Sequence, residues 1–185
     1  QLKSFTLPEY KALWPLFEAV VNAIQSIEDS ENKDCGKIFI TADREHCLQG
    51  ISGSFVSFCI KDNGVGFGKE NYNSFCEAYS MLKLNKGCKG IGRFLWLKAF
   101  KNVHIVSSFK EEDTWFIREF DFNVKKEIDP EDNIFQNPGG HEWNTVVKLE
   151  NCFEKYKGKF PVTIDVLAKK IIEHCLLYFL SDSRC

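Results

Sequence analysis

The sequence predicts an α/β fold, a two-layer α/β sandwich in which helices cover one face of a mixed, mostly antiparallel sheet. Three observations support this. Apolar residues recur every three or four positions near both ends of the chain, which is typical of amphipathic helices. Apolar runs rich in β-branched and aromatic residues, typical of strands, fill the middle. The order helix, strands, helix, strands, helix favours a mixed sheet over the regular alternation of a parallel fold.

The first long helix is expected within residues 8–31, where the apolar positions have helical spacing. These positions are Leu13, Phe17, Val20, Ile24 and Ile27. Proline is tolerated only in the first turn of a helix. The long helix should therefore begin near Pro15, with a separate short helix before it.

Two strands should follow, at 37–43 and 54–62. The second is apolar on both faces toward its end, which predicts a central position in the sheet. After the glycine-bearing stretch 63–68, helices are expected at 69–83 and 93–100, on either side of a second glycine-rich segment. The remaining strands are expected at 103–109, 114–122 and 145–151, with turn formers at 130–143, and an amphipathic helix is expected at 163–180.

The composition fits a globular protein with a sizeable core. The 185 residues are 44% hydrophobic and 14% aromatic, which excludes intrinsic disorder. A formal net charge of −2 gives no overall attraction to nucleic acid or to anionic lipid. No apolar run reaches the roughly 18 residues that would span a bilayer, so we expect no membrane association.

The eight cysteines form no C-x-x-C pair, which argues against a zinc ribbon. Several lie in apolar segments, which favours buried free thiols and a reducing, cytoplasmic location. We expect residues 1–155 to form one domain and residues 156–185 to add a helix that packs on it or leads into another domain. The missing initiator methionine leads us to expect a piece of a longer protein.

The stretch NKGCKGIGRF (85–94) can be tested against three kinds of phosphate loop. The Gly-Lys pairs of the chain are never followed by Ser or Thr, which excludes a Walker loop. The order G-x-x-G-x-G excludes the dinucleotide fingerprint, and the missing H-R-D and D-F-G exclude a protein kinase. A glycine run that opens a helix near Gly92 still favours the binding of an anion at the helix N-terminus. The basic residues around it are Lys83, Lys86, Lys89 and Arg93. The alternative is a glycine-rich turn with a solvated basic rim.

Two other stretches carry candidate polar groups. Glu18, Asn22 and Gln25 lie on one stripe of the first long helix, where they could also be an ordinary polar face. Asp62 ends a buried strand and is followed by Gly64 and Gly66. A carboxylate there can accept a hydrogen bond from an amine while the glycines let a flat ring approach, although D-N-G is also a common turn.

In this order, E-x-x-x-N, D-x-G-x-G and G-x-x-G-x-G resemble the motifs of the GHKL superfamily, which includes gyrase B, the large heat-shock ATPase chaperones, histidine kinases, MutL and the MORC ATPases. NTVVKL (144–149) resembles the G-T-x-V-x-L strand of that superfamily, with Asn144 in place of glycine. The resemblance covers residues 8–150, and the lid loop is most similar to that of bacterial ATP-binding proteins with GKGIGRF. It implies the Bergerat ATP-binding fold.

The resemblance also implies roles for individual residues. Glu18 matches the general base that activates water, and Asn22 matches the Mg²⁺ ligand. Asp62 matches the acceptor of the adenine amino group, with Gly64 and Gly66 beside the base. Thr145 supports the adenine contact through its hydroxyl. Residues 67–92 match the ATP lid, whose expected phosphate contacts are Lys83, Gly87, Lys89, Gly90, Ile91, Gly92 and Arg93.

Two departures from the superfamily pattern bear on activity. Gln25 stands where many relatives have an aspartate. A lysine from a following domain, which such ATPases often use to reach the γ-phosphate, is not among these residues. We therefore expect ATP to bind well and to be hydrolysed slowly.

The expected function is Mg²⁺-dependent ATP hydrolysis in a larger protein, with lid closure and an ATP-dependent homodimer acting on a DNA or protein client. One alternative is phosphotransfer of the histidine-kinase type, but only 17 residues precede Glu18 and none is histidine. The other alternative is a non-hydrolysing nucleotide sensor or interaction module. The four histidines of the chain have no metal-ligand spacing.

Overall fold

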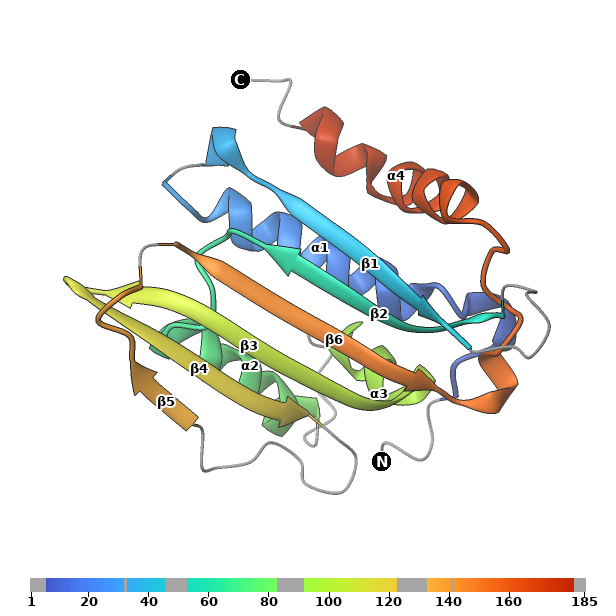
Figure 1. Ribbon diagram of the computed structural model, residues 1–185, viewed down its shortest axis with the longest axis horizontal. Coiled ribbons are helices and arrows are strands. Elements are labelled where there is room, and N and C mark those ends of the chain that lie inside the picture. The colour runs from blue at the N-terminus through green and yellow to red at the C-terminus, as the bar shows by residue number, and fades with distance from the viewer. Residues whose placement is uncertain are drawn as a thin grey trace.

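Six strands form one sheet, and helices cover one of its faces (Figure 1). The computed structural model describes residues 6–31, 33–45, 53–82, 92–122, 133–140 and 142–181. The strand order is β1-β2-β6-β3-β4-β5. The strands are β1 (Ile38–Arg44), β2 (Phe55–Asp62), β3 (Phe100–Glu111), β4 (Thr114–Phe122), β5 (Asn133–Gln136) and β6 (Asn144–Cys152). The two-layer α/β sandwich is thus confirmed, but each of these strand pairs is antiparallel, so the sheet is not mixed over the described strands.

The helices agree with the sequence pattern except around Gly92. The α-helices are α1 (Trp14–Glu28), α2 (Lys69–Leu82), α3 (Trp96–Ala99) and α4 (Ile164–Ser181), and the short 3₁₀ turns are η1 (Glu9–Lys11), η2 (Lys33–Cys35), η3 (Gly92–Leu95) and η4 (Glu154–Tyr156). Pro15 lies in the first turn of α1, after the separate turn η1, as predicted. The single helix expected at 93–100 is instead a 3₁₀ turn followed by one α turn, because Phe100 already begins β3.

Strand β5 was not predicted, because Pro and Gly surround its four residues. It pairs with β4 at the edge of the sheet, where Ile117 lies opposite Phe135. Ile134 and Phe135 are both exposed. Four residues between turn formers are too few to show a strand period, so only the pairing reveals this element.

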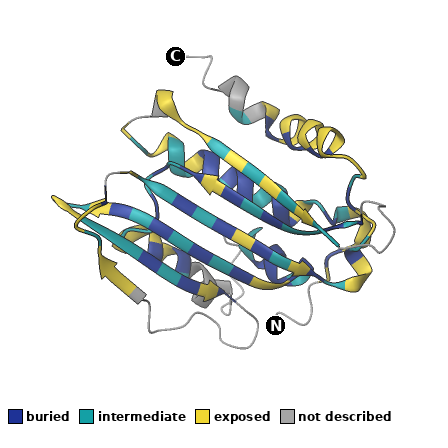
Figure 2. Cartoon of the chain, viewed as in Figure 1, coloured by how far each residue is buried: buried dark blue, intermediate teal, exposed yellow. Residues whose placement is uncertain are grey.

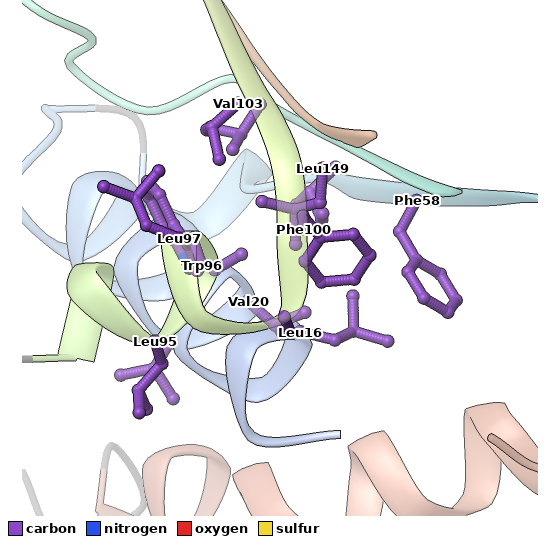
Figure 3. Packing of buried hydrophobic residues seen from close by; sticks show 14 of the residues in the cluster. Leu16, Val20, Phe58, Leu95, Trp96, Leu97, Phe100, Val103 and Leu149 are labelled. Atoms are coloured by element: carbon purple, nitrogen blue, oxygen red, sulfur yellow. The ribbon is translucent and has the colours of Figure 1, made fainter. Parts of the chain in front are cut away.

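The core lies between the helices and the inner face of the sheet. Figure 3 shows Leu16 and Val20 of α1 pointing toward Trp96 and toward Phe100, where β3 begins. All four are almost fully buried. Burying a large apolar side chain contributes about 1.5–3 kcal/mol, so this layer holds α1 and α3 firmly against the sheet. The buried and exposed positions alternate along the strands, as Figure 2 shows.

An aromatic cluster fixes α2 on β4. Tyr72 and Phe75 of α2 meet Phe120 edge to face, with ring centroids 5.2 and 5.6 Å apart. Phe67, just before α2, meets Phe75 and Phe120 in the same way at 5.4 Å. Such pairs add about 0.5–1.5 kcal/mol each beyond burial. The start of α2 is therefore anchored to the sheet.

Helix α4 packs on α1 through its buried residues Leu167, Ile171 and Cys175. The His174 ring stacks on Phe17 with centroids 4.2 Å apart. Within the described part of the chain, no helix is long and apolar enough to cross a membrane. The five cysteines described there are free, as expected, but only Cys152 and Cys175 are buried and Cys35 is exposed.

Candidate functional site

A row of polar side chains crosses the inner face of the sheet. Asp62 of β2 lies opposite Thr145 of β6, Thr145 lies opposite Ser107 of β3, and Ser107 lies opposite Arg118 of β4. Their exposed fractions are 4%, 4%, 0% and 5%, and no other polar or charged residue of the described ranges is buried to this degree. Burial of polar groups is costly unless they are hydrogen-bonded. Each member of the row has at least one hydrogen bond, but the buried Nε of Arg118 has no hydrogen-bond partner among the described residues.

Asp62 holds the loop that follows it and keeps one oxygen for other contacts. Its Oδ1 accepts a hydrogen bond from the Gly64 amide at 2.9 Å. Burial raises the pKa of Asp62 from 3.8 to about 6, and the Gly64 hydrogen bond only partly opposes this. No cation contributes to the shift. The carboxyl therefore lacks a charged partner among the described residues, so an external hydrogen-bond donor would stabilise its ionised form.

The two hydroxyls beside Asp62 are joined to each other. Ser107 Oγ lies 2.9 Å from Thr145 Oγ1, and it also accepts a hydrogen bond from the Phe67 amide at 2.9 Å. Arg118 donates from Nη1 to the Phe67 carbonyl at 2.8 Å. The peptide groups on both sides of Phe67 are thus tied to the sheet.

The glycines of the loop after Asp62 serve two different purposes. Gly66 has φ +71°, and a Cβ there would approach Ser107 Oγ to 2.6 Å, so the loop can lie on the row only with glycine at this position. Gly64 instead packs against Ser26 of α1, whose backbone and hydroxyl would overlap a Cβ. Asn63 ties the loop to the segment before β1, since it accepts from the Lys37 amide at 2.6 Å.

The polar stripe of helix α1 faces the loop that follows Asp62. Asn22, Gln25, Ser26 and Asp29 all line one cavity. Spacings of three and four place them on one face, as the sequence predicted for the first two. Ser26 Oγ also accepts from the Gly66 amide at 3.4 Å, which joins α1 to the loop.

Glu18 lies one turn before Asn22 and is not among the residues that line the cavity. Gly92 is packed directly on it, because a Cβ on Gly92 would overlap the Glu18 carboxylate. Burial raises the pKa of Glu18, while the charge of Arg93 and a hydrogen bond with the Asn22 side chain oppose the rise. A carboxylate only accepts hydrogen bonds, so Asn22 donates from Nδ2 and keeps Oδ1 for another contact.

Arg93 brings positive charge to this end of the cavity. Burial lowers its pKa, and Glu18 and Cys76 oppose that shift. Its guanidinium lies over the Phe75 ring, 4.5 Å from the centroid, and Arg93 lines the cavity with Phe75.

The cavity has a volume of about 240 Å³ and lies between α1, the loop, α2 and the sheet. Thr145 and Val147 of β6 and Trp96 of α3 line it, and so do Asn71, Ser74 and Phe75 of α2. Drug-sized ligands occupy cavities of about 300–1,000 Å³. The enclosed part is thus of a size for a ring system and an attached sugar, with a longer ligand extending beyond it.

The structure brings most of the predicted residues it describes to this cavity. Asn22, Asp62, Gly66, Arg93 and Thr145 line it, while Glu18, Gly64 and Gly92 lie directly beside these residues. The predicted phosphate contacts Lys83, Gly87, Lys89, Gly90 and Ile91, together with Lys86, lie outside the described residues.

Sequence reasoning missed Ser107, Arg118, Ser26, Asn71 and Trp96. Ser107 and Arg118 each sit in an alternating strand pattern, which could have marked them as polar residues on an inner face. The strand order that joins them to Asp62 is not visible in the sequence.

Comparison of the sequence with models of protein families finds no match, and a search of curated proteins finds no significant similarity. Support for a function therefore comes from the sequence motifs and from the geometry of the cavity.

Proposed function

We propose that this chain binds an adenine nucleotide and hydrolyses ATP with Mg²⁺. We further propose that it acts within a larger protein in which lid closure and ATP-dependent dimerisation drive conformational change, a role supported by the resemblance to the GHKL superfamily. The observation that carries the proposal is the polarity of the cavity. One end offers a buried acceptor with no cationic partner, Asp62, and the other end offers a cation, Arg93. A ligand with an amine-bearing ring and an anionic tail fits this arrangement in one direction only.

The base end favours adenine over guanine. Adenine presents an amino donor beside a ring nitrogen acceptor, whereas guanine presents a carbonyl oxygen at the corresponding position. Asp62 can accept from the amine through the oxygen that Gly64 does not use. The carbonyl of guanine would instead face that carboxylate, and two acceptors repel each other.

The other end has the groups that phosphates and a hard cation need. The guanidinium of Arg93 can pair with phosphate oxygens. Asn22 Oδ1 is a suitable ligand for Mg²⁺, which prefers oxygen ligands and keeps most of its waters. When bound there, Mg²⁺ would neutralise charge that develops on the transferring phosphoryl group.

Glu18, which lies beside the cavity without lining it, is the proposed general base that activates water. Burial makes its carboxylate a stronger base than an exposed one, because its pKa is raised. The Asn22 side chain interacts with the Glu18 carboxylate, and Gly92, the last residue of the expected lid, packs against that carboxylate. Glu18 thus stands between the proposed metal ligand and the proposed phosphate-binding arginine.

The test compares Glu18→Gln with a control on the same helix, Glu28→Gln, whose side chain is exposed. Calorimetric titration with ATP and GTP measures binding, and phosphate release with Mg²⁺ or EDTA measures turnover. We expect Glu18→Gln to lower turnover by about 100-fold or more while ATP still binds, and Glu28→Gln to match the parent.

Three outcomes would overturn parts of the proposal. An unchanged rate in Glu18→Gln would refute the general base. Binding of ATP without turnover in the parent would favour the nucleotide sensor, and a stable phosphohistidine formed from labelled ATP would favour phosphotransfer. Equal affinity for ATP and GTP would refute the proposal that Asp62 selects adenine over guanine.

A further inference from the structure

The polar row Asp62, Thr145, Ser107 and Arg118 extends well beyond the two residues that the sequence motifs identify. It crosses four strands of a layer that is otherwise apolar. Only Asp62 and Thr145 line the cavity. Ser107 and Arg118 lie behind them, so any effect they have on a ligand must pass through other groups.

The two outer members of the row hold the loop that borders the cavity. The amide of Phe67 donates to Ser107 Oγ, and the carbonyl of Phe67 accepts from Arg118 Nη1. Arg118 also reaches the Gly68 carbonyl at 3.3 Å, and its guanidinium lies 4.2 Å from the Tyr72 ring centroid. The loop is therefore tied to β3 and β4 on both sides of Phe67, a residue that itself lines the cavity.

These contacts determine where the hydroxyl hydrogens can go. Ser107 is fully buried and its oxygen already accepts from Phe67. Its own hydrogen needs an acceptor, and Thr145 Oγ1 at 2.9 Å is the acceptor that the described contacts supply. With Ser107 donating, the hydrogen of Thr145 is left to point toward Asp62 or into the cavity.

We infer that Ser107 is a positioning residue that makes the Thr145 hydroxyl a hydrogen-bond donor to the ligand, directly or through one water, beside the acceptor Asp62. Arg118 supports this by holding Phe67 over Ser107. The inference rests on the proposed adenine-nucleotide binding. The ring nitrogen next to the amine of adenine is the acceptor that such a donor would meet.

The test pairs a variant with a ligand analogue. ADP and 1-deaza-ADP, which lacks that ring nitrogen, are titrated against the parent, Ser107→Ala and Ser108→Ala. Ser108 is the matched control, because it is the next residue on the same strand and lines a hollow on the opposite face of the sheet. Ser107→Cys keeps the shape of the side chain but has only a weak hydrogen-bond donor. It replaces Ser107→Ala in the test if Ser107→Ala does not fold.

In the parent and in Ser108→Ala we expect ADP to bind about tenfold more tightly than 1-deaza-ADP, the effect of one hydrogen bond. In Ser107→Ala or Ser107→Cys that ratio should fall to about two or less. A merely structural role would weaken both ligands alike and leave the ratio unchanged, which would overturn the inference.

Two further outcomes separate the inference from the proposed function. If the parent binds ADP and 1-deaza-ADP equally, the inference fails while nucleotide binding stands. If the parent binds neither ligand, the proposed function fails and the inference falls with it.

Discussion

Asp62→Asn should stabilise the empty protein at neutral pH. The carboxyl is 4% exposed, and its pKa is raised from 3.8 to about 6 by burial. Above pH 6 the folded protein must hold an ionised group that the unfolded chain keeps in water. A rise of this size corresponds to about 3 kcal/mol. Asparagine removes the charge and retains an oxygen that can accept from the Gly64 amide, so most of this cost should disappear.

The pH dependence of the gain follows from the direction of the shift. For an acid whose pKa is higher in the folded state, the folded protein binds more protons between the two pKa values, so stability falls as the pH rises through that range. Below about pH 3 the carboxyl is neutral in both states, so the gain from Asp62→Asn should already be small at about pH 4 and should vanish below it. Above about pH 6 the gain should reach its full size.

Urea unfolding measured at about pH 4 and at about pH 7.5 tests this, with the exposed Asp43→Asn as control. A gain below about 1 kcal/mol at the higher pH, or an equal gain at both, would refute the burial cost. The same variant should lose ATP binding at neutral pH, since the amide brings a donor toward the amine.

Two further predictions concern the neighbours of Glu18 and of Phe67. Gly92→Ala should lower ATP turnover by about 100-fold, because the new Cβ displaces the Glu18 carboxylate by about an ångström. Gly139→Ala is the control, because open space surrounds that position. Equal phosphate release by both variants would contradict the expectation. Arg118→Leu should lower the free energy of unfolding by about 1–3 kcal/mol, because the carbonyls of Phe67 and Gly68 lose their donor. Urea unfolding checks this, and a neutral result would mean that the loop finds other partners.

The sequence alone predicted the elements whose pattern is local and long enough. Helix α1 was placed by its apolar spacing, and its start by Pro15. The central strands were placed by their apolar runs. Strand β5 was missed because four residues between turns show no period, and the helix after Gly92 was predicted too long because Phe100 continues directly into β3. Both errors concern the pairing of strands across the sheet, which the local pattern of apolar residues does not specify.

The residues of the candidate site also fall into those that local motifs predicted and those that only the fold brings together. Glu18, Asn22, Asp62 and Thr145 were found because their motifs have fixed spacing along the chain. Ser107 could not be connected with Asp62, since 45 positions and two intervening strand pairings separate them in the row. The role of Gly64 was also not apparent, because its close contact is with Ser26 on a different element.

The polar row could serve only the fold, or it could be part of a ligand site. The two possibilities predict opposite signs for the change in stability when Asp62 is replaced. In a network that serves only the fold, removing any member leaves a buried partner unsatisfied, so every variant is destabilised. In a ligand site, a member that waits for an external partner is costly in the empty protein, and its removal is stabilising. Asp62 has no charged partner among the described residues, whereas Ser107 and Arg118 hold Phe67. A gain for Asp62→Asn together with losses for Ser107→Ala and Arg118→Leu would therefore identify Asp62 as the end of the row that is kept for a ligand.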